Sequence, residues 1–441
     1  MIKLPKNVAM LLERIEQEGH TAWVVGGSVR DSLRGDQPND WDLATSAHPQ
    51  TLLYCLQEFD VRPTGLQHGT VTVYLEGKPY EITTYRQETD YSDGRHPDAV
   101  AFVQDIETDL ARRDFTMNAM AWHPKRGLCD PFGGQEDLKN GLIRAVGKPQ
   151  RRFTEDALRI LRGLRFVSRT GFVIEPKTAT AMWNCTPLLQ QIAPERIQQE
   201  LSGILTGRYV GRVLRAYPWI LAQIFPEIAP MMGHHQHNPH HKFDIWEHTV
   251  RAVESAPADL VLRMTMLLHD CGKPAAYTLD DWGIGHFYGH PEKSAEIATR
   301  LLERLRFSHA DRDRILRLIE YHDYPLGEDV RVIRRRLAEF GERDFRALLQ
   351  IKKCDSCGKL TVPQNLEELD RTARLVDESI ASNVCLSLRQ LAIRGNDLTA
   401  LGLYGRQIGE MLQQLLDRVV DGTLANERDV LVAFVKKERS S

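Results

Sequence analysis

Two stretches near the start of the 441-residue chain decide the kind of fold it builds: AWVVGGSVRDSLR (residues 22–34) and DWDLAT (residues 40–45). The first passes from a short apolar segment through two glycines into a polar segment that opens with a serine. This order predicts a strand, a glycine turn and a helix. A turn without side chains at a helix start lets backbone N–H groups come close to phosphate oxygens. Gly26 and Gly27, with Arg30 available to neutralise charge, therefore form our candidate triphosphate site.

Asp40 and Asp42 lie two residues apart in the second stretch. If this segment is extended, both carboxylates point to one face, because side chains two positions apart share a side of a strand. Converging carboxylates suit Mg²⁺, and a pair of such ions can activate an attacking hydroxyl and stabilise a leaving pyrophosphate. Two nearby acids alone are more often a solvated turn, so this prediction depends on the glycine turn beside them. Glu81, on a later predicted strand, is a candidate third acid, with a surface role as the simpler interpretation.

Five ordered motifs resemble the signature of the class II tRNA nucleotidyltransferases and bacterial poly(A) polymerases, within the polymerase-β-like nucleotidyltransferases. Besides the two stretches above, they are RRDFTMNAM (residues 112–120), DPFGG (residues 130–134) and EDALR (residues 155–159). The chain has no GxxxxGK[ST] motif, which excludes an ordinary P-loop protein. The resemblance implies three groups of site residues: catalytic Mg²⁺ ligands at Asp40 and Asp42; triphosphate contacts at Gly27, Arg30 and Arg113, beside Gly26 of the same turn; and base contacts at Asp156 and Arg159. We also predict nucleotide contacts from Arg162 and Arg165.

The spacing of the EDALR motif can select a base. On a helix Asp156 and Arg159 are i, i+3 neighbours, so we expect them on one polar face. Cytosine and adenine both present an amino donor beside a ring-nitrogen acceptor, which a carboxylate and a guanidinium satisfy, whereas uracil and guanine present the reverse. The pair therefore predicts selection of CTP and ATP without a nucleic-acid template. For these two residues alone, an acid and an arginine on a solvated helix face would be the simpler alternative.

The overall charge gives no sign of a nucleic-acid substrate. The chain holds 57 Lys and Arg against 60 Asp and Glu, a net charge of −3, which argues against a globally basic nucleic-acid-binding protein. Residues 143–169, however, hold eight basic and only two acidic side chains. Such a basic strip can bind the phosphates of an RNA backbone.

The opening residues alternate charged and apolar side chains, and no run of about 18 apolar residues occurs anywhere. We therefore expect a cytoplasmic protein with no membrane partner, and no obligate protein partner is evident. The seven cysteines are scattered and odd in number, which fits reduced thiols. Cys354 and Cys357 form a lone CxxC, for which a structural or incidental role is the simpler interpretation.

A second constellation lies in the middle of the chain. His269-Asp270 ends an apolar run, with His248 upstream and His322-Asp323 downstream. Such nitrogen and oxygen donors can hold a divalent metal that activates water, and the pattern resembles the HD phosphohydrolase superfamily. We predict metal ligands at His248, His269, Asp270 and Asp323, with the identity of the metal open, and further ligands or phosphate contacts at His286 and His290. Beside a nucleotidyltransferase, the resemblance implies a phosphohydrolase acting on RNA 3′ ends.

Strand signals nearly vanish after about Phe153, and helical periodicity continues to the end. We predict a multidomain chain with an α/β (α+β) nucleotidyltransferase head that contains a small mixed sheet, followed by all-α neck, HD and tail regions. The predicted boundaries are 1–142 for the head, 143–230 for a neck that binds RNA and nucleotide, 231–345 for the HD metal-dependent domain, and 346–441 for a tRNA-binding tail.

Together the motifs predict an Mg²⁺-dependent enzyme that adds C, C and A to the 3′ acceptor end of tRNA from CTP and ATP. An A-adding tRNA enzyme or a poly(A) polymerase shares these motifs and stays open. Residues 90–100 resemble the family's flexible loop, which favours an enzyme able to add A. An alternative of another class is an HD metal-dependent phosphohydrolase whose head only binds RNA.

Overall fold

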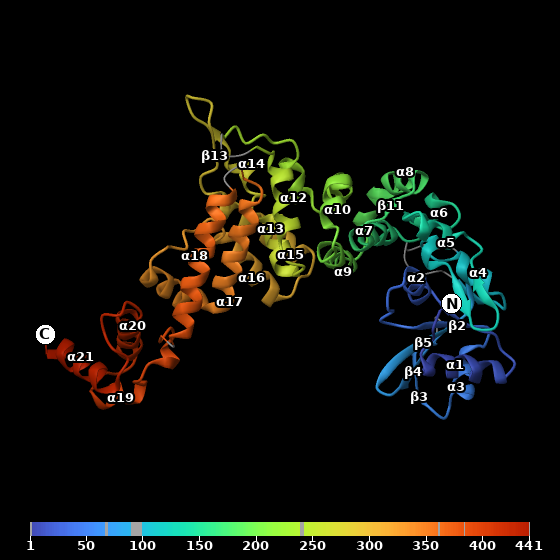
Figure 1. Ribbon diagram of the computed structural model, residues 1–441, viewed down its shortest axis with the longest axis horizontal. Coiled ribbons are helices and arrows are strands. Elements are labelled where there is room, and N and C mark those ends of the chain that lie inside the picture. The colour runs from blue at the N-terminus through green and yellow to red at the C-terminus, as the bar shows by residue number, and fades with distance from the viewer. Residues whose placement is uncertain are drawn as a thin grey trace. The chain divides into compact units, whose positions relative to one another are not determined.

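The computed structural model describes residues 2–66, 69–89, 99–238, 242–359, 362–382 and 384–440. It consists of two compact units, Met1–Pro226 and Glu227–Ser441; Figure 1 labels many of their helices and strands. Most of the predicted flexible loop, residues 90–98, lies outside the described residues. Within the described ranges, no helix combines the length and the apolar character that crossing a bilayer requires.

Within its described residues, the first unit is built around a seven-stranded sheet in the order β3-β4-β5-β2-β1-β8-β9. Its strands are β1 (Ala22–Val25), β2 (Asp42–Thr45), β3 (Asp60–Gly65), β4 (Thr70–Leu75), β5 (Lys78–Thr84), β8 (Ala121–His123) and β9 (Gly127–Cys129). Neighbouring strands are antiparallel except β2 and β5, which are parallel. The predicted mixed sheet in the head is confirmed.

Alternate residues of the central strands face two different cores. Val24 and Leu43 belong to an apolar cluster that includes the buried side of α1 (Lys6–Gln17) and of α3 (Pro49–Cys55). Val25 and Ala44 belong to a second cluster, which includes α4 (Ile106–Ala111). Because successive side chains of a strand point to opposite faces, both faces of the sheet are covered. The packing on both faces fixes the position of β2, and with it Asp42 at the start of that strand.

The remainder of the first unit is mainly helical. Its elements are α2 (Gly27–Arg34), β6 (Arg86–Thr89), β7 (Ala99–Phe102), α5 (Gly134–Lys139), β10 (Leu142–Ile143), α6 (Pro149–Glu155), α7 (Leu158–Thr170), β11 (Val173–Ile174), α8 (Pro176–Cys185), α9 (Pro194–Leu205), α10 (Val210–Ala216) and α11 (Pro218–Ile224). Helices α7 and α9 pack against each other. This packing brings side chains of both helices toward one pocket, described below.

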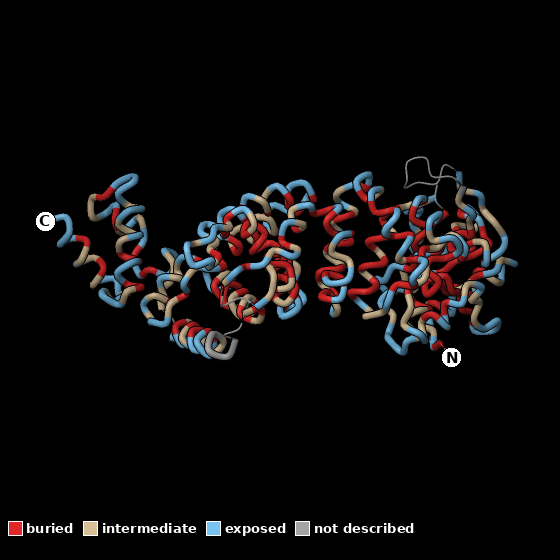
Figure 2. The backbone as a smooth tube through the Cα atoms, turned by 90° about the horizontal axis from the view of Figure 1, so that it is seen from above, coloured by how far each residue is buried: buried red, intermediate tan, exposed pale blue. Residues whose placement is uncertain are grey.

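The second unit is a helical bundle followed by a smaller helical group. The bundle contains α12 (Ile245–Ser255), α13 (Leu260–Leu268), α14 (Lys273–Ala276), β12 (Thr278–Leu279), β13 (Gly285–His286), α15 (His290–Arg304), α16 (His309–Glu320), α17 (Val330–Ser356) and α18 (Val362–Ala381). The C-terminal helices α19 (Gly395–Ala400), α20 (Arg406–Val420) and α21 (Arg428–Ser440) share an apolar cluster of their own. Figure 2 shows buried residues gathered inside each unit. The predicted helical remainder after the head is confirmed.

Candidate nucleotide site and metal cluster

The predicted strand, glycine turn and helix form at β1, Gly26 and α2. Gly26 has φ 71°, in the left-handed region that favours glycine. A Cβ atom on Gly26 would lie 2.8 Å from Nη1 of Arg113, so a side chain there would displace the guanidinium. The backbone N–H groups at the start of α2 and the Arg113 guanidinium therefore lie together, as a triphosphate site requires.

Buried polar side chains hold the cations of this site in place. Arg30 donates Nη1 to Oδ1 of Asn118 at 2.8 Å and Nε to Asp31 at 2.7 Å. Arg113 lies 3.5 Å from Asp109, and its Nε has no hydrogen-bond partner among the described residues. Burial lowers the pKa of Arg113, while Asp109 acts in the opposite direction. A buried guanidinium with an unused donor is suited to an anionic ligand.

The acidic side of the site comes from two parallel strands. β2 starts at Asp42, and Leu43 pairs with Ile82 of β5, which places Glu81 beside Asp42. Desolvation and the charge of Glu81 raise the pKa of Asp42; Arg113 lowers it and Asp40 raises it further. Asp40 precedes β2, so only Asp42 of the two aspartates belongs to the strand. The three carboxylates still crowd together, and a divalent cation would relieve their repulsion.

Asp156 does not lie on the same helix as Arg159, contrary to our expectation. α6 ends at Glu155 and α7 begins at Leu158, and Asp156 between them has extended backbone angles. The physical reason is local capping: Oδ1 of Asp156 accepts from the Leu158 N–H at 3.0 Å. Oδ2 accepts from Nη2 of Arg196 on α9 at 2.8 Å. Asp156 is thus fixed by a helix start and an ion pair.

Arg159 is held in place by partners other than Asp156. It donates to Oε2 of Glu155 at 2.8 Å and to the carbonyl oxygens of Arg152 at 3.0 Å and Arg112 at 3.3 Å. Arg159 and Asp156 nevertheless line the same pocket. The acid and the guanidinium of the EDALR motif therefore face one space from two different elements.

One pocket of about 490 Å³ is lined by all the predicted nucleotide-binding residues and by one of the two predicted catalytic acids. Those that line it are Gly26, Gly27, Arg30, Asp42, Arg113, Asp156, Arg159, Arg162 and Arg165. Asp40 is not among the lining residues. Three further residues that line the pocket were not predicted from the sequence. Asp114 and Asn118 belong to the RRDFTMNAM motif, whereas no local pattern distinguishes Arg196.

Two of the pocket arginines are paired with buried acids. Arg162 lies 2.7 Å from Oδ2 of Asp114, and Arg165 lies 3.2 Å from Glu200. Burial by itself raises the pKa of Asp114, but Arg162 and hydrogen bonds from Asn118 and the backbone hold it at about 2. The ion pairs orient both guanidinium groups at the pocket.

In the second unit, three histidines share one hydrogen-bond pattern. The Nδ1 atoms of His269, His290 and His322 each bond the backbone carbonyl three positions earlier, at 2.8, 2.9 and 2.6 Å. Because a carbonyl oxygen only accepts, Nδ1 carries the proton and Nε2 keeps its lone pair. Metal-binding histidines are typically oriented in this way.

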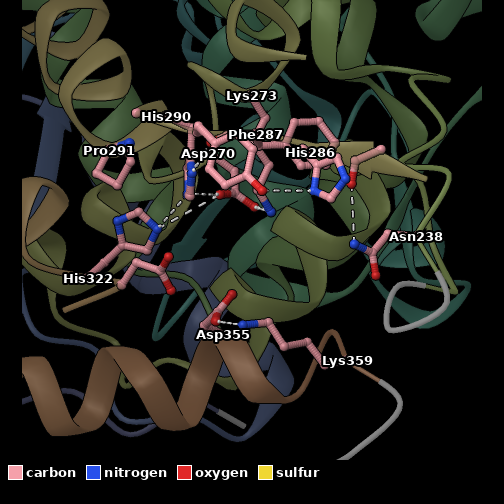
Figure 3. Close-up of a pocket in the computed structure, with 14 residues that line it drawn as sticks. Asn238, Asp270, Lys273, His286, Phe287, His290, Pro291, His322, Asp355 and Lys359 are labelled. Atoms are coloured by element: carbon pink, nitrogen blue, oxygen red, sulfur yellow. Dashed lines mark hydrogen bonds and ion pairs between the residues drawn. The ribbon is translucent and has the colours of Figure 1, made fainter. Parts of the chain in front are cut away.

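Asp270 lies between two groups of ligand atoms in the described part of the chain. Its Oδ2 is 3.4 Å from Nε2 of His248 and 3.3 Å from Nε2 of His269. Its Oδ1 is 3.4 Å from Nε2 of His290 and 3.9 Å from Nε2 of His322. Within each group the ligand atoms all lie within 4.8 Å of one another, and all five side chains are buried. Figure 3 shows His290 and His322 on the same side of Asp270.

Asp355, which the sequence did not single out, lies against the first ligand group. Its Oδ1 lies 2.9 Å from Nε2 of His248 and 3.4 Å from Nε2 of His269. Asp323 is exposed and lines the pocket, and neither it nor Asp355 belongs to the two ligand groups. Asp355 follows His248 by 107 positions, within the CxxC segment, and no spacing rule connects the two.

Two lysines balance the acids of this cluster. Nζ of Lys273 lies 2.7 Å from Asp270, and Lys359 pairs with Asp355. Burial raises the pKa of Asp270, but His269 and Lys273 hold it well below its ordinary value. Burial also raises the pKa of Asp355, but Lys359 and His248 hold it well below the ordinary range. Both acids are therefore anionic, the state in which carboxylates bind metals.

The pKa values of His269 and His322 shift in opposite directions in this environment. Burial lowers the pKa of His269, but Asp270 and Asp355 outweigh burial and raise it. Burial and the neighbouring His269 lower the pKa of His322 to about 3. Nε2 of His269 has no hydrogen-bond partner among the described residues, although it faces two carboxylates. A cation bound among these atoms would accept the imidazole lone pair and balance the negative charge of both carboxylates. The donor set therefore fits a divalent metal.

Three family models match the chain. They are the poly A polymerase head domain over residues 22–144, the probable RNA and SrmB-binding site of polymerase A over residues 171–232, and the tRNA nucleotidyltransferase domain 2 over residues 290–435. The chain is 33% identical to a CCA-adding enzyme from Enterococcus faecalis, over 99% of this chain and 96% of the relative. It is 34% identical to a CCA-adding enzyme from Levilactobacillus brevis, over 98% of both chains.

Solved structures show the same fold. The CCA-adding enzyme of Bacillus stearothermophilus in complex with CTP superposes with a TM-score of 0.73 at 26% identity, over 98% of this chain and 97% of that chain. The Thermotoga maritima CCA-adding enzyme complexed with tRNA_CCA superposes with a TM-score of 0.62 at 19% identity, over 98% and 96%.

Proposed function

Because the chain belongs to the family of CCA-adding enzymes, which are nucleotidyltransferases, we propose that it adds C, C and A to tRNA 3′ ends at the pocket of the first unit. The observation that carries this proposal is the convergence of a glycine turn, several arginines and Asp42 with Asp156 and Arg159 in one pocket. Full-length relatives that are CCA-adding enzymes favour this activity over A addition or poly(A) synthesis.

In this proposal the basic side chains bind the triphosphate and the acids bind Mg²⁺. The N–H groups at the start of α2, Arg30 and the unused donor of Arg113 contact the phosphates. Asp40 and Asp42, with Glu81 beside them, hold Mg²⁺, which supplies charge neutralisation at the reacting phosphate. Asp42, at the start of β2, lines the pocket in which we place the nucleotide.

Asp156 and Arg159 select the base. A carboxylate offers about four acceptor positions, so Asp156 can accept from an exocyclic amino group while Leu158 and the two Nη atoms of Arg196 occupy three of them. Arg159 donates to the adjacent ring nitrogen. Uracil and guanine would place a donor against the guanidinium and an acceptor against the carboxylate, which polar sites reject strongly.

Replacing Asp42 tests this proposal. We expect purified Asp42→Asn to lose about 100-fold or more in addition of labelled CTP and ATP to a tRNA that lacks its terminal CCA. Asp60→Asn is the matched control, because it removes the same charge from an exposed position on β3. A folded Asp42→Asn protein as active as the control would overturn the proposal. An enzyme that only adds A would extend none of this tRNA with CTP.

A second activity is favoured by the histidines of the second unit. We propose that the cluster around Asp270 holds a divalent metal and hydrolyses phosphoesters at RNA 3′ ends. Three Nε2 lone pairs, already oriented by backbone carbonyls, meet a carboxylate that two ligand groups share. A bound cation supplies Lewis acidity at a phosphoryl oxygen. Lys273 and Lys359, which neutralise the acids, then become available to the phosphate.

Metal content tests this second proposal directly. We expect full-length Asp270→Asn to retain much less divalent metal after dialysis than the wild type, measured by inductively coupled plasma mass spectrometry, and to lose hydrolysis of 2′,3′-cyclic nucleotides. Asp323→Asn keeps the metal, because Asp323 lies outside both ligand groups. Nucleotide addition by Asp270→Asn stays normal. Equal metal content in the two variants would show that the cluster is no metal site.

A further inference from the structure

The pocket beside the metal cluster has an aromatic wall. His286, Phe287 and Tyr288, on and just after β13, line it together with Asp270 and Lys273. The volume of the pocket, about 320 Å³, falls in the range of sites for small ligands. The acids and histidines of the metal cluster form one part of this lining, and the aromatic residues lie outside both ligand groups.

His286 and Tyr288 form a stacked pair. Their ring centroids are 5.3 Å apart and the rings are 7° from parallel. Nε2 of His286 lies 2.9 Å from Oδ2 of Asp280. The other oxygen of Asp280 accepts from the N–H groups of Trp282 at 3.0 Å and Ile284 at 2.9 Å. The turn between β12 and β13 therefore fixes the plane of the His286 ring.

The hairpin that carries this pair is attached firmly to the unit. Gly285 donates its N–H to the carbonyl of His237 at 2.8 Å, and a Cβ atom on Gly285 would lie 2.1 Å from the carbonyl oxygen of Gln236. Tyr277, just before β12, packs against Phe287 with ring centroids 5.5 Å apart, and its hydroxyl lies 2.7 Å from Nδ1 of His237. The aromatic wall is thus preorganised before any ligand binds.

Tyr288 is 79% exposed although it lines a pocket. A tyrosine that served only the core would be covered. An exposed ring that stacks on a second ring is suited to stacking against a planar ligand as well. Any of the nucleobases can stack on such an aromatic platform. Lys273 and Lys359 lie beside Asp270 and Asp355, where a phosphate would bind, and Nζ of Lys273 is also 5.4 Å from the centre of the Phe287 ring.

We propose that the His286–Tyr288 pair binds the base of the terminal nucleotide whose phosphate lies at the Asp270 cluster. The second unit then acts on nucleotide phosphoesters and discriminates against phosphoesters that lack a base. Because stacking does not read hydrogen-bonding edges, all four bases are accepted. This inference rests on the proposed hydrolase function of the cluster.

The test compares two cyclic phosphodiesters on the full-length, metal-loaded protein. Adenosine 2′,3′-cyclic phosphate carries a base, and glycerol 1,2-cyclic phosphate does not. We expect Tyr288→Ala to raise KM for the adenosine substrate about 10-fold with little change in kcat, because loss of one stacking partner weakens binding by about this factor. The preference for the adenosine substrate over the glycerol substrate falls by the same factor. Tyr288→Phe restores the preference.

Trp282→Ala is the matched control, since Trp282 is an exposed aromatic residue of the same hairpin that does not line the pocket. Equilibrium dialysis of adenosine 3′-monophosphate gives a readout that is independent of turnover, and we expect its affinity to fall about 10-fold in Tyr288→Ala alone. If Tyr288→Ala and Trp282→Ala behave alike in both measurements, the platform proposal is wrong. Metal content of each variant serves as the folding control.

Failure of the two proposals can be distinguished. If the wild type hydrolyses neither substrate, the hydrolase function fails, while the dialysis experiment still decides whether Tyr288 binds a base. A short RNA that ends in a 2′,3′-cyclic phosphate separates the two sources of the ligand. The same dependence on Tyr288 with this RNA identifies an RNA end, whereas dependence with the mononucleotide alone identifies a free nucleotide.

Discussion

Asp114 organises several residues of the nucleotide pocket by itself. It accepts hydrogen bonds from Nε of Arg162 at 2.8 Å, from Nδ2 of Asn118 at 3.1 Å and from the N–H of Phe115 at 2.8 Å. Asn118 in turn accepts from Arg30 at 2.8 Å. One buried carboxylate therefore orients two of the predicted nucleotide-binding arginines, Arg162 directly and Arg30 through Asn118.

The low pKa of Asp114 predicts a pH-dependent contribution to stability. Burial raises this pKa, but Arg162 and Asn118 hold it at about 2, below the ordinary value. Because the folded pKa lies below the unfolded value of about 4, ionised Asp114 stabilises the folded state at pH values above 4. This stabilisation is lost as the pH falls from about 4 toward about 2. We expect Asp114→Asn to lower the free energy of unfolding by about 2 kcal/mol at pH 7.

Urea unfolding at pH 7 and pH 3 measures this contribution. The stability difference between wild type and Asp114→Asn shrinks at pH 3, because protonation of the unfolded wild-type chain removes much of the advantage. Asp60→Asn, at an exposed position, is the control and changes stability little at either pH. A difference that is the same at both pH values would contradict the argument.

At the scale of elements, α17 supplies the last acid of the metal cluster. The backbone turns at Gly341, with φ 73°, inside this long helix. Just beyond its end, Gly358 packs against the ring of His248: a Cβ atom there would lie 2.1 Å from Nδ1. The end of α17 thus sets the positions of both Asp355 and His248.

Gly358→Ala therefore tests how closely α17 must approach the cluster. The added methyl group displaces His248 from Asp355 and Asp270, and we expect metal affinity to fall about 10-fold or more. The measurement is a metal titration of the full-length protein. Gly409→Ala is the control, because no atom of the described residues outside its own stretch of helix lies within 4 Å of the added carbon. Unchanged affinity in Gly358→Ala would mean that His248 is no ligand.

At the scale of the whole molecule, each of the two units has a core and a candidate site of its own. The net charge of −3 conceals the basic strip of residues 143–169, part of which lines the nucleotide pocket through Arg159, Arg162, Arg165 and Arg169. The division into head, neck, HD domain and tail remains our proposal. Its boundary between residues 345 and 346 falls within α17, and we propose to extend the HD domain through Lys359 so that it includes Asp355.

The sequence by itself determined the features that depend on neighbouring residues. A strand, a glycine turn and a helix form at residues 22–34 because the turn needs a positive φ and the flanking segments have suitable composition. The mixed sheet, the helical remainder and the family followed from local periodicity and ordered motifs. His248, His269 and Asp270 were identified because an HD pair after an apolar run is a local pattern.

Only the tertiary structure decided which distant residues meet. Parallel pairing of β2 with β5 places Glu81 beside Asp42, packing of α9 against α7 brings Arg196 to Asp156, and α17 brings Asp355 to His248. Such contacts join elements that lie far apart in the chain, and the total packing of the unit selects them rather than any spacing in the sequence. The break at Asp156 is a smaller case, in which a cap and an ion pair override helical periodicity.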